Sequence, residues 1–390
     1  MPIINRFAEF QDEIAGWRRD LHRNPELLYD THRTAGFVAQ KLEEFGLDDI
    51  ATGIGRTGVV GVIKGRNSAS GRVLGLRADM DALPITEETG AEHASQTPGK
   101  MHACGHDGHT AMLLGAAKYL SEARNFDGTV VVIFQPAEEG GAGAKAMIED
   151  GLITRWGIDE IYGMHNLPGL PVGAFSMCKG AIMAATDSFE ITIEGRGGHA
   201  AKPNETIDPI VAGSHVVAAL QSIASRNTDP LESAVVSVTQ FHAGSAFNVI
   251  PQSAVLRGTI RTLKETVRDM TETRLKAVAG SVAEAFGATA RISFSRGYPV
   301  TVNHDAQTEF AASVASLVAG EERVDTATAP MMGGEDFSYM LLERPGAFIF
   351  AGNGDSAGLH HPKYDFNDDL IPVGCSYWVK LVETALPAAA

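Results

Sequence analysis

Apolar residues recur at steps of three or four positions at the start of the chain, which predicts a helix with one apolar stripe. The stripe consists of Phe7, Phe10, Ile14, Trp17 and Leu21. The helix should end before Pro25, because proline disfavours helical backbone in the residue that precedes it. Further helices are predicted over residues 33–45, 110–123, 207–225, 264–286, 306–318 and 373–384.

Continuous apolar runs of strand length lie between several of these helices. They cover residues 58–63, 73–76, 130–134 and 158–164 and, late in the chain, 347–351. Strands that are apolar throughout are typical of a sheet covered on both faces. Their alternation with helices predicts the fold class α/β, with a mostly parallel sheet and helices on both of its faces.

The pattern changes near Asp187, where apolar and polar residues begin to alternate as they do in half-exposed strands. Alternating strands are predicted over residues 188–194, 234–241, 254–262 and 288–295. With the two helices between them they give the order β-α-β-β-α-β, which is the ferredoxin-like unit. We therefore expect a second domain over residues 187–296, inserted into a large domain made of residues 1–186 and 297–390.

Composition narrows the class of partner and the compartment. The chain has 390 residues, 48 of them acidic and 32 basic, and a net charge of −16, which disfavours nucleic acid or an anionic membrane as the main partner. Three cysteines are too few for a disulfide framework and fit a reducing compartment. The first residues lack the pattern of a signal peptide, and no run of 18 uncharged apolar residues occurs, so we expect a soluble cytoplasmic protein.

The segment MHACGHDGHT, which begins at Met101, is the densest cluster of reactive side chains. Three histidines, a cysteine and an aspartate fall within eight residues, just before a predicted helix. Histidine and cysteine are good ligands for zinc and similar borderline metals. The alternative is a loop that is rich in histidine by chance and holds a buried thiol.

Adjacent carboxylates follow the predicted strand 130–134, at Glu138 and Glu139. Ligands of open α/β sheets bind outside the carboxyl ends of strands. One carboxylate there could bind metal while the other acts as a general base on water. A solvated acidic turn is the alternative interpretation of this pair.

Other predicted strands and loops bring further candidates to the same rim of the sheet. His165 ends the strand 158–164, His360 and His361 follow the strand 347–351 in a loop, and Asp79 ends the strand that begins at residue 73. Asp79 could be a ligand or a partner that orients a histidine. A hydrogen-bonded core histidine remains the alternative for His165. Taken together, these sites hold enough ligands for two metal ions.

Motifs of other enzyme classes are absent from the sequence or weaker than the metal-site pattern. The chain has no GxxxxGK[ST] phosphate loop and no GxSxG nucleophile elbow, and the GxGxxG of residues 53–58 precedes a strand instead of following one. Cys104 with His106 could form a thiol–base pair. That thiol hydrolase would be inhibited by alkylation and indifferent to chelators.

Eight motifs resemble those of the dinuclear metallo-amidohydrolases, a family that includes aminoacylases, hippurate hydrolases and auxin–amino acid conjugate hydrolases. They occur in family order between residues 77 and 369, as RADMDALP, MHACGHDGHT, FQPAEEGGAGA, MHNLP, GRGGHAAKP, FNVIP, GGEDF and LHHPKYDFND. The family fold is an α/β metal domain that carries an inserted ferredoxin-like lid, which agrees with the patterns above. The lid of relatives is often the surface through which they form a homodimer or homotetramer.

The resemblance implies a role for each matching residue. Cys104 would bridge two divalent metals, zinc or manganese with cobalt or nickel as alternatives, and the ligand set would be completed by His106, Glu139, His165 and His360. Glu138 would be the general base and Asp79 the partner behind a ligand. His361 stands at the variable position of the family pattern, which favours His360 as the ligand. In the second domain, His199 would reach the substrate carbonyl, and Asn248 and Arg261 would contact the substrate, although a surface salt bridge is an equal alternative for Arg261.

The activity implied by this resemblance is metal-dependent hydrolysis of the amide bond of N-acyl amino acids, such as hippurate or N-acetyl amino acids. A dipeptidase, an aminopeptidase or a deacetylase of N-acetyl-diaminopimelate would use the same site and remains an alternative. A metal-binding protein without turnover is a further alternative, which a missing base or ligand would favour. Here every expected residue is present.

Overall fold

The computed structural model describes residues 4–388, which form two compact units. The first unit consists of the chain up to Gly180, Val302–Ala329 and the chain from Asp336 on. The second consists of Ala181–Thr301 and Pro330–Glu335. Within the described residues, no helix is both long and apolar enough to cross a membrane.

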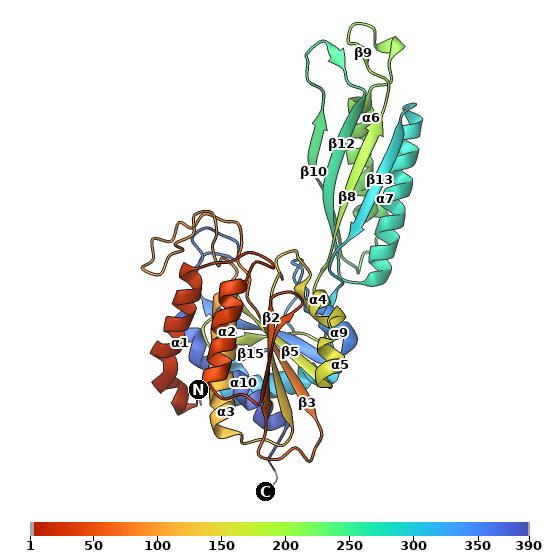
Figure 1. Cartoon of the computed structure of the whole chain (residues 1–390). Helices are drawn as coiled ribbons and strands as arrows, with labels where there is room; N and C mark the ends of the chain where they lie inside the picture. Colours follow the sequence, from red (N-terminus) through yellow and green to blue (C-terminus); the bar gives the residue numbers. More distant parts are fainter. Residues whose placement is uncertain (1–3, 389–390) are drawn as a thin grey trace. The chain divides into compact units, whose positions relative to one another are not determined.

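An eight-stranded sheet forms the centre of the first unit, in the order β1-β2-β4-β3-β5-β16-β6-β15 (Figure 1). The four middle strands run parallel to one another: β4 (Thr129–Gln135), β3 (Val73–Asp79), β5 (Glu160–Pro168) and β16 (Gly346–Gly354). The outer strands are β1 (Asp49–Ile54), β2 (Gly58–Lys64), β6 (Phe175–Ser176) and β15 (Val324–Asp325). Strands β1 and β2 pair antiparallel at one edge.

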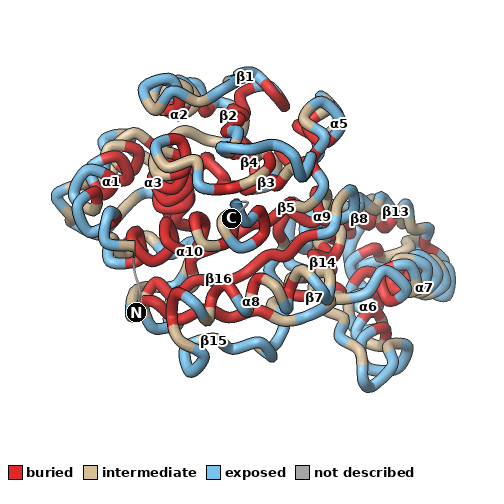
Figure 2. The backbone as a smooth tube through the Cα atoms, turned by 90° about the horizontal axis from the view of Figure 1, so that it is seen from below, coloured by how far each residue is buried: buried red, intermediate tan, exposed pale blue. Residues whose placement is uncertain are grey.

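Helices lie on both sides of this sheet, because its middle strands are apolar on both faces. On one side are α1 (Asn5–Arg23), α2 (His32–Glu44), α3 (His106–Ala123) and α10 (Ile371–Ala385), and on the other are the short α4 (Gly143–Glu149), α5 (Leu152–Trp156) and α9 (Ser338–Glu343) (Figure 1). Helix α8 (Asp305–Ala319) packs against α10 and β16. Figure 2 shows the buried residues gathered in the strands and the inner faces of the helices.

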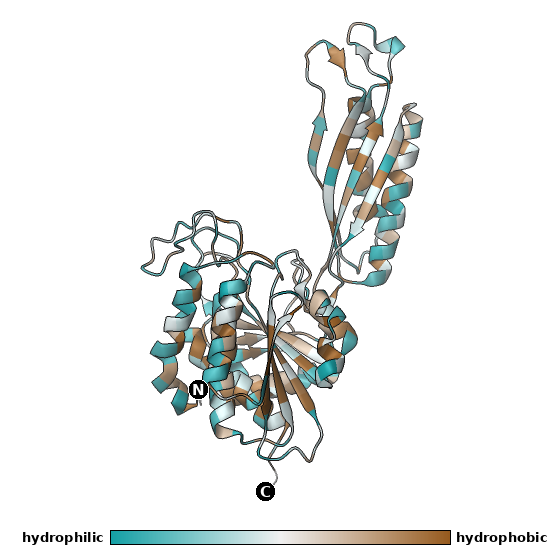
Figure 3. Cartoon of the chain, in the orientation of Figure 1, coloured by the Kyte–Doolittle hydropathy of each residue, from teal (hydrophilic) through white to brown (hydrophobic). Residues whose placement is uncertain are grey.

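The second unit has an antiparallel sheet in the order β10-β12-β8-β13. Its strands are β8 (Ala185–Glu194), β10 (Ala234–Ala243), β12 (Ser253–Thr262) and β13 (Thr289–Arg296). Helices α6 (Pro209–Ser222) and α7 (Glu265–Ala285) share one core with the buried residues of these strands, so both cover the same face. The alternation of polar and apolar residues along the strands is visible in Figure 3. Shorter strands are β9 (Gly198–His199) and β11 (Val249–Ile250), which pair with each other, and β7 (Gly180–Met183) and β14 (Thr301–Asn303).

The predicted α/β fold class with a β-α-β-β-α-β insertion is confirmed, and the differences are local. Helix α6 begins two residues later than predicted because Asp208 caps it, accepting hydrogen bonds from the backbone N–H groups of Ile210 and Val211, with Pro209 in the first turn. A π-helical turn, Ile223–Asn227, follows it. Strand β1 was not predicted, because only two of its six residues are buried and its apolar pattern is weak.

Candidate metal centre

The candidate ligands of the first unit meet at the carboxyl ends of its parallel strands. Asp79 is the last residue of β3, His165 lies in the second half of β5, and Glu138 and Glu139 follow β4. His106 is the first residue of α3, and Cys104 precedes it by two residues. This is the rim at which open α/β sheets bind their ligands.

Among the five groups of three possible ligands in the described residues, two share one sulfur. Cys104, His106 and His165 make one group, and Cys104, Glu139 and His360 make the other, with the ligand atoms of each group within 4.8 Å of one another. The Sγ atom of Cys104 lies 3.4 Å from Nε2 of His165. Nε2 of His360 lies 3.3 Å from Oε1 of Glu139. The structure therefore brings together all five residues predicted to be ligands.

Buried polar atoms without a partner mark this cluster. Both ring nitrogens of His106 and Oε1 of Glu139 are buried and have no hydrogen-bond partner among the described residues. Such atoms are rare in folded proteins, because each costs free energy when it is taken out of water. Sulfur, imidazole nitrogen and carboxylate oxygen together suit a divalent metal of borderline softness, so the residues fit the metal ions that the sequence predicts.

Glu138 lies beside these groups and is itself buried, with 7% of its surface exposed. Its carboxylate falls within 4.8 Å of ligand atoms of His106 and Glu139. The residue before it, Ala137, has φ +55°, a left-handed conformation that residues with a side chain rarely adopt. The turn places the two glutamates next to the cluster directly after the strand ends.

Asp79 contacts a different histidine from the one that its predicted role implies. Its Oδ1 lies 2.6 Å from Nδ1 of His109, whereas its Oδ2 is 3.6 Å from Nε2 of His106. Burial alone raises the pKa of Asp79, but the charges of His106, Arg77 and His109 outweigh it and hold that pKa well below its usual range. Asp79 is thus an ionised group behind the cluster.

His109 was not singled out by the sequence, although it is the third histidine of MHACGHDGHT. Its Nδ1 faces Asp79, and its Nε2 accepts a hydrogen bond of 2.9 Å from the backbone N–H of Asn166. Both nitrogens are therefore engaged. The side chain of Asn166 donates to the carbonyl of Cys104 at 2.6 Å and accepts from the hydroxyl of Tyr364 at 2.7 Å. This chain of contacts supports the ligand segments of α3 and β5 from behind.

Backbone conformation shapes the ligand segments as well. Gly105, between Cys104 and His106, has φ +90°, and a Cβ atom there would come within 2.3 Å of the Asn166 side chain and 2.5 Å of the Tyr364 hydroxyl. Only glycine fits this turn. His360 has φ +64°, and its backbone N–H donates to the carbonyl of Ala103 at 2.7 Å.

His360 and His361 differ in what their rings contact. The ring of His360 lies against Glu139, whereas Nδ1 of His361 accepts a hydrogen bond of 3.0 Å from the backbone N–H of Lys363. The position of the two rings therefore agrees with the choice of His360 as the ligand.

The surroundings of Cys104 oppose its use as a nucleophile. Burial raises the pKa of this thiol well above its ordinary value, and the carboxylates of Glu139, Glu138 and Asp79 raise it further. Reactive cysteines require the opposite, an electropositive environment that lowers the pKa. The imidazole that lies 3.4 Å from its sulfur belongs to His165, whereas a thiol–base pair would need His106 there. A bound divalent cation reverses this electrostatic preference and stabilises the thiolate.

The three remaining candidates belong to the second unit. His199 lies in β9 opposite Val249 of β11, is exposed, and accepts a hydrogen bond at Nδ1 from the N–H of Ala201. The carbonyl of Asn248 accepts from the N–H of Ala200 at 3.0 Å. Both therefore lie at the short antiparallel pairing of β9 with β11, two strands that are far apart in the chain.

Arg261 lies on β12 and is half-buried. Its guanidinium donates to the carbonyl of Ile260 at 2.9 Å and to the hydroxyl of Thr259. It forms no ion pair with any described residue. The structure therefore does not show the surface salt bridge that was the alternative for Arg261.

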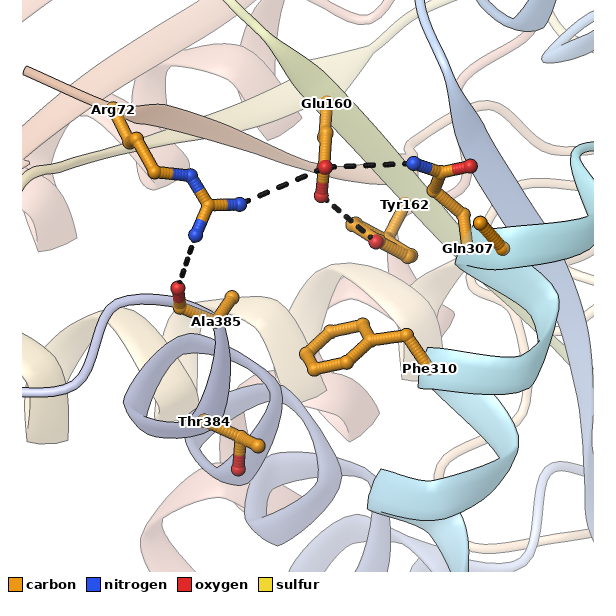
Figure 4. A pocket seen from close by; sticks show the side chains of 8 residues that line it. Arg72, Glu160, Tyr162, Gln307, Phe310, Thr384 and Ala385 are labelled. Atoms are coloured by element: carbon orange, nitrogen blue, oxygen red, sulfur yellow. Dashed lines mark hydrogen bonds and ion pairs between the residues drawn. The ribbon is translucent and has the colours of Figure 1, made fainter.

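The opposite edge of the first unit holds a cavity of about 280 Å³, which Figure 4 shows from close by. It lies where β3 and β5 begin. Glu160 accepts a hydrogen bond from the Tyr162 hydroxyl at 3.0 Å and pairs with Arg72 at 3.6 Å. Because these polar groups satisfy one another and no cluster of ligands faces them, the cavity is not the candidate active site.

Residues 75–384 match Peptidase family M20/M25/M40. This match covers well over half of the chain. The chain is a member of this family. The predicted resemblance is confirmed, and so is the prediction of a hydrolase that acts on amide bonds.

Known members of the M20 family are similar to this chain over nearly its full length. A hippurate hydrolase of Campylobacter jejuni is 44% identical over 98% of both chains, and an N-acetylcysteine deacetylase of Bacillus subtilis is 40% identical over 97% of this chain and 98% of the relative. The crystal structure of the YXEP protein of Bacillus subtilis, a dinuclear metal-binding peptidase of the M20 family, is 36% identical, covers 98% of this chain and 100% of its own, and has a TM-score of 0.85. Together with the two ligand groups, this family supports a centre for two metal ions.

Proposed function

We propose that this M20 hydrolase cleaves the amide bond of N-acyl amino acids, hippurate-like or N-acetylated, and releases a carboxylic acid and a free amino acid. The observation that carries the proposal is the pair of ligand groups that share Cys104, next to the buried carboxylate of Glu138. The similarity to a hippurate hydrolase and to an N-acetylcysteine deacetylase supports this class of substrate.

Cys104, His106, Glu139, His165 and His360 would hold the two metal ions. Zinc and manganese are the proposed ions, with cobalt and nickel as alternatives, and the thiolate of Cys104 favours zinc or cobalt because sulfur is a soft ligand. When bound, such ions lower the pKa of water and polarise the carbonyl of an amide.

The reaction also needs a proton carrier. Glu138 takes a proton from the attacking water and later passes it to the nitrogen of the leaving amine, as a general base that becomes a general acid. Its burial and its place one residue before a ligand suit this work. Asp79 is ionised and contacts His109, and this contact holds His109 in position behind the ligand segments.

The second unit supplies the remaining contacts in this proposal. His199 stabilises the oxyanion that forms at the substrate carbonyl, Asn248 contacts the substrate, and Arg261 pairs with its carboxylate. In this proposal, residues 1–186 and 297–390 form the catalytic domain, and residues 187–296 form a lid that closes over the substrate.

The lid would also join two or four copies of the chain. Large apolar side chains are exposed on the second unit, where a monomer gains nothing from them: Ile210, Val211, Phe241, Phe247 and Val249. Burial against a second copy would remove them from water.

We place the protein in the cytoplasm, which is supported by its three free cysteines, Cys104, Cys178 and Cys375.

The test is release of amino acid, detected with ninhydrin, from a panel of N-acyl amino acids and dipeptides. The protein is stripped with a chelator and assayed with and without added Zn²⁺ or Mn²⁺. Release from hippurate or N-acetyl amino acids that returns only with metal is expected. Release from dipeptides alone would replace the proposal with a dipeptidase, and activity that survives the chelator but not alkylation would indicate a thiol hydrolase.

A further inference from the structure

One aromatic side chain of the second unit is fully exposed close to the residue proposed to contact the substrate carbonyl. Phe247 is the most exposed of the large apolar side chains in the described residues. It lies in the turn before β11, and the carbonyl of the next residue, Asn248, accepts a hydrogen bond of 3.0 Å from the N–H of Ala200, which follows His199. The turn that carries Phe247 is therefore held against the end of β9 (Figure 1).

A second apolar side chain lies next to His199. Val249 is directly opposite His199 in the pairing of β11 with β9, so the two side chains are on the same face. Val249 is half-exposed, and His199 is exposed. Single exposed apolar residues need no explanation, but two of them beside one polar group form a surface suited to a ligand in which an apolar part is joined to a polar one.

The same surface lacks charge. Residues 243–256 contain no acidic or basic side chain, although 21% of the whole chain is charged. An N-acyl amino acid has a charged end, the carboxylate, and an uncharged end, the acyl group, which is bonded directly to the carbonyl that His199 would contact. An uncharged apolar surface beside His199 therefore suits the acyl end of the substrate and not its carboxylate.

A permanent contact between copies of the chain would not leave this surface free. His199 can act on a substrate only if it remains accessible, and its apolar neighbours on β11 and in the preceding turn must then remain accessible as well. Burial between copies therefore explains the exposed apolar side chains of α6 better than it explains Phe247 and Val249.

We propose that Phe247 is a specificity residue that contacts the acyl group of the substrate, with Val249 beside it, and that the protein prefers an aromatic acyl group such as benzoyl to acetyl. Two aromatic rings in contact attract each other by more than the area that they bury, and an acetyl group is too small to make such a contact. The inference rests on the proposed function, because it takes His199 as the contact of the substrate carbonyl.

The substitution Phe247→Ala tests this with little effect on folding, because a fully exposed ring adds nothing to the core. The kcat/KM of the Zn²⁺-loaded variant for hippurate should fall by about 10–100-fold, whereas its kcat/KM for N-acetylglycine should fall by less than about threefold. Phe247→Leu keeps an apolar side chain and should recover most of the activity on hippurate. Equal losses on both substrates, or no loss on hippurate, would overturn the proposal.

Leu231→Ala is the matched control. Leu231 is also almost fully exposed in the second unit, but it precedes β10, whose first residue pairs with the last residue of β12. Phe247 instead lies shortly before the first residue of β12, so the two side chains belong to opposite ends of the sheet. The control should keep both kcat/KM values. Light scattering should give one mass for all these proteins, and a Phe247→Ala protein of lower mass that loses both activities would assign the ring to an interface between copies.

Dipeptides separate a failure of this proposal from a failure of the proposed function. If the wild type hydrolyses no N-acyl amino acid, the proposed function fails, and phenylalanyl-glycine and alanyl-glycine replace the two substrates, because their first residue takes the place of the acyl group. A lost preference for phenylalanyl-glycine in Phe247→Ala would then support the role of Phe247, and an unchanged ratio of the two kcat/KM values would overturn it. Release of amino acid from neither class of substrate would overturn both proposals.

Discussion

At the scale of single residues, replacing Glu138 and replacing Glu139 should impair the enzyme in different ways. Glu138→Gln should lower kcat by about 10²–10⁴-fold, because the side chain keeps its size and loses only its ability to take a proton. Metal content should stay at two ions. Glu139→Gln should instead lose metal, because a neutral amide is a poor ligand. Measurement of kcat and of metal content in both variants checks this. Loss of metal in Glu138→Gln would mean that Glu138 is the ligand and not the base.

The left-handed backbone of His360 makes a second prediction. Glycine is usually less stable than alanine in a folded chain, but at φ +64° an alanine side chain clashes with its own backbone. Metal-free His360→Gly should therefore be more stable than His360→Ala by about 1 kcal/mol. Both variants lose the same imidazole, so the comparison isolates the backbone. Urea unfolding of the two proteins measures the difference, and an alanine variant of equal or greater stability would contradict it.

The contacts of individual side chains were the part of the site that the sequence could not predict. The segment 101–110 predicts a metal site because cysteine and histidine rarely gather so densely, but it does not show which histidines would bind. His109 turns away to Asp79 and Asn166, and that contact depends on strands 30 and 57 positions away in the chain. The contacts of Asp81 were equally hidden, because its carboxylate accepts from the backbone N–H groups of Glu138 and Glu139, which a sequence does not display.

At the scale of elements, a buried polar network connects α1 to the end of α3 that carries a proposed ligand. His22 of α1 lies with its Nδ1 2.8 Å from Asp107, the residue after His106, and its Nε2 3.4 Å from Glu87. One turn earlier, Arg18 bonds to Asp368 at 2.8 Å and lies 3.5 Å from Asp107. The network therefore joins the segment of one proposed ligand, His106, to the segment that follows another, His360.

This network should make stability depend on pH. Burial alone lowers the pKa of His22, but Asp107 and Glu87 outweigh burial and the repulsion of Arg18, and raise that pKa to about 9; the rings of His93 and His102 also lie near. In the unfolded chain histidine titrates near 6.5, so the stability from charged His22 is complete below pH 6.5 and is lost as pH rises to 9. It amounts to at most about 3 kcal/mol.

Urea unfolding of the metal-free protein at pH 6.5 and pH 9 measures this loss. In His22→Gln the loss between the two values should be smaller by up to about 3 kcal/mol, because the titrating group is gone. His32→Gln, at the exposed start of α2, should behave as the wild type does. An equal loss in wild type and His22→Gln would assign the pH dependence to other groups.

Elements with a strong period were the predictable ones. The helix 264–286 and the strand 130–134 coincide with α7 and β4, because one long apolar stripe or one wholly buried run leaves little ambiguity. The short α4 and α5 were missed, because helices of seven and five residues are too short for a period to emerge. Their form is set by packing within the fold, not by local sequence.

At the scale of the whole molecule, metal should stabilise one unit and not the other. All five proposed ligands belong to the first unit, and the second has a core of its own. Ions present at 100 times their Kd add about 2.7 kcal/mol each to the unit that binds them. The melting temperature of the first unit should rise by roughly 5–10 °C, and that of the second should not move.

The tryptophans allow the two units to be followed separately. Trp17, Trp156 and Trp378 are the three tryptophans of the chain, and all lie in the first unit. Their fluorescence should report the transition that metal shifts, while far-ultraviolet circular dichroism should also show a transition that metal leaves in place. A single transition that moves as one by both probes would mean that the units unfold together.

The order of elements was readable at this scale, but the order of strands in the large sheet was not. The sequence β-α-β-β-α-β sufficed to predict the inserted unit because its strands are close in the chain. In the large sheet β16 lies beside β5, although almost 180 residues separate them, with the whole second unit in between. No local pattern specifies a pairing of that kind.

The same separation has a consequence for how the protein is made. Residues 104 and 360 are 256 positions apart, and a ribosome that adds about 5–20 residues per second needs roughly 13–50 s to pass from one to the other. During that time a growing chain already contains Cys104, His106 and Glu139 but not His360. This half-built set of a thiol, an imidazole and a carboxylate is the form most open to a wrong metal ion and to oxidation of sulfur. With the proposed ligands, two ions can be held as a pair only after the ribosome has passed residue 360.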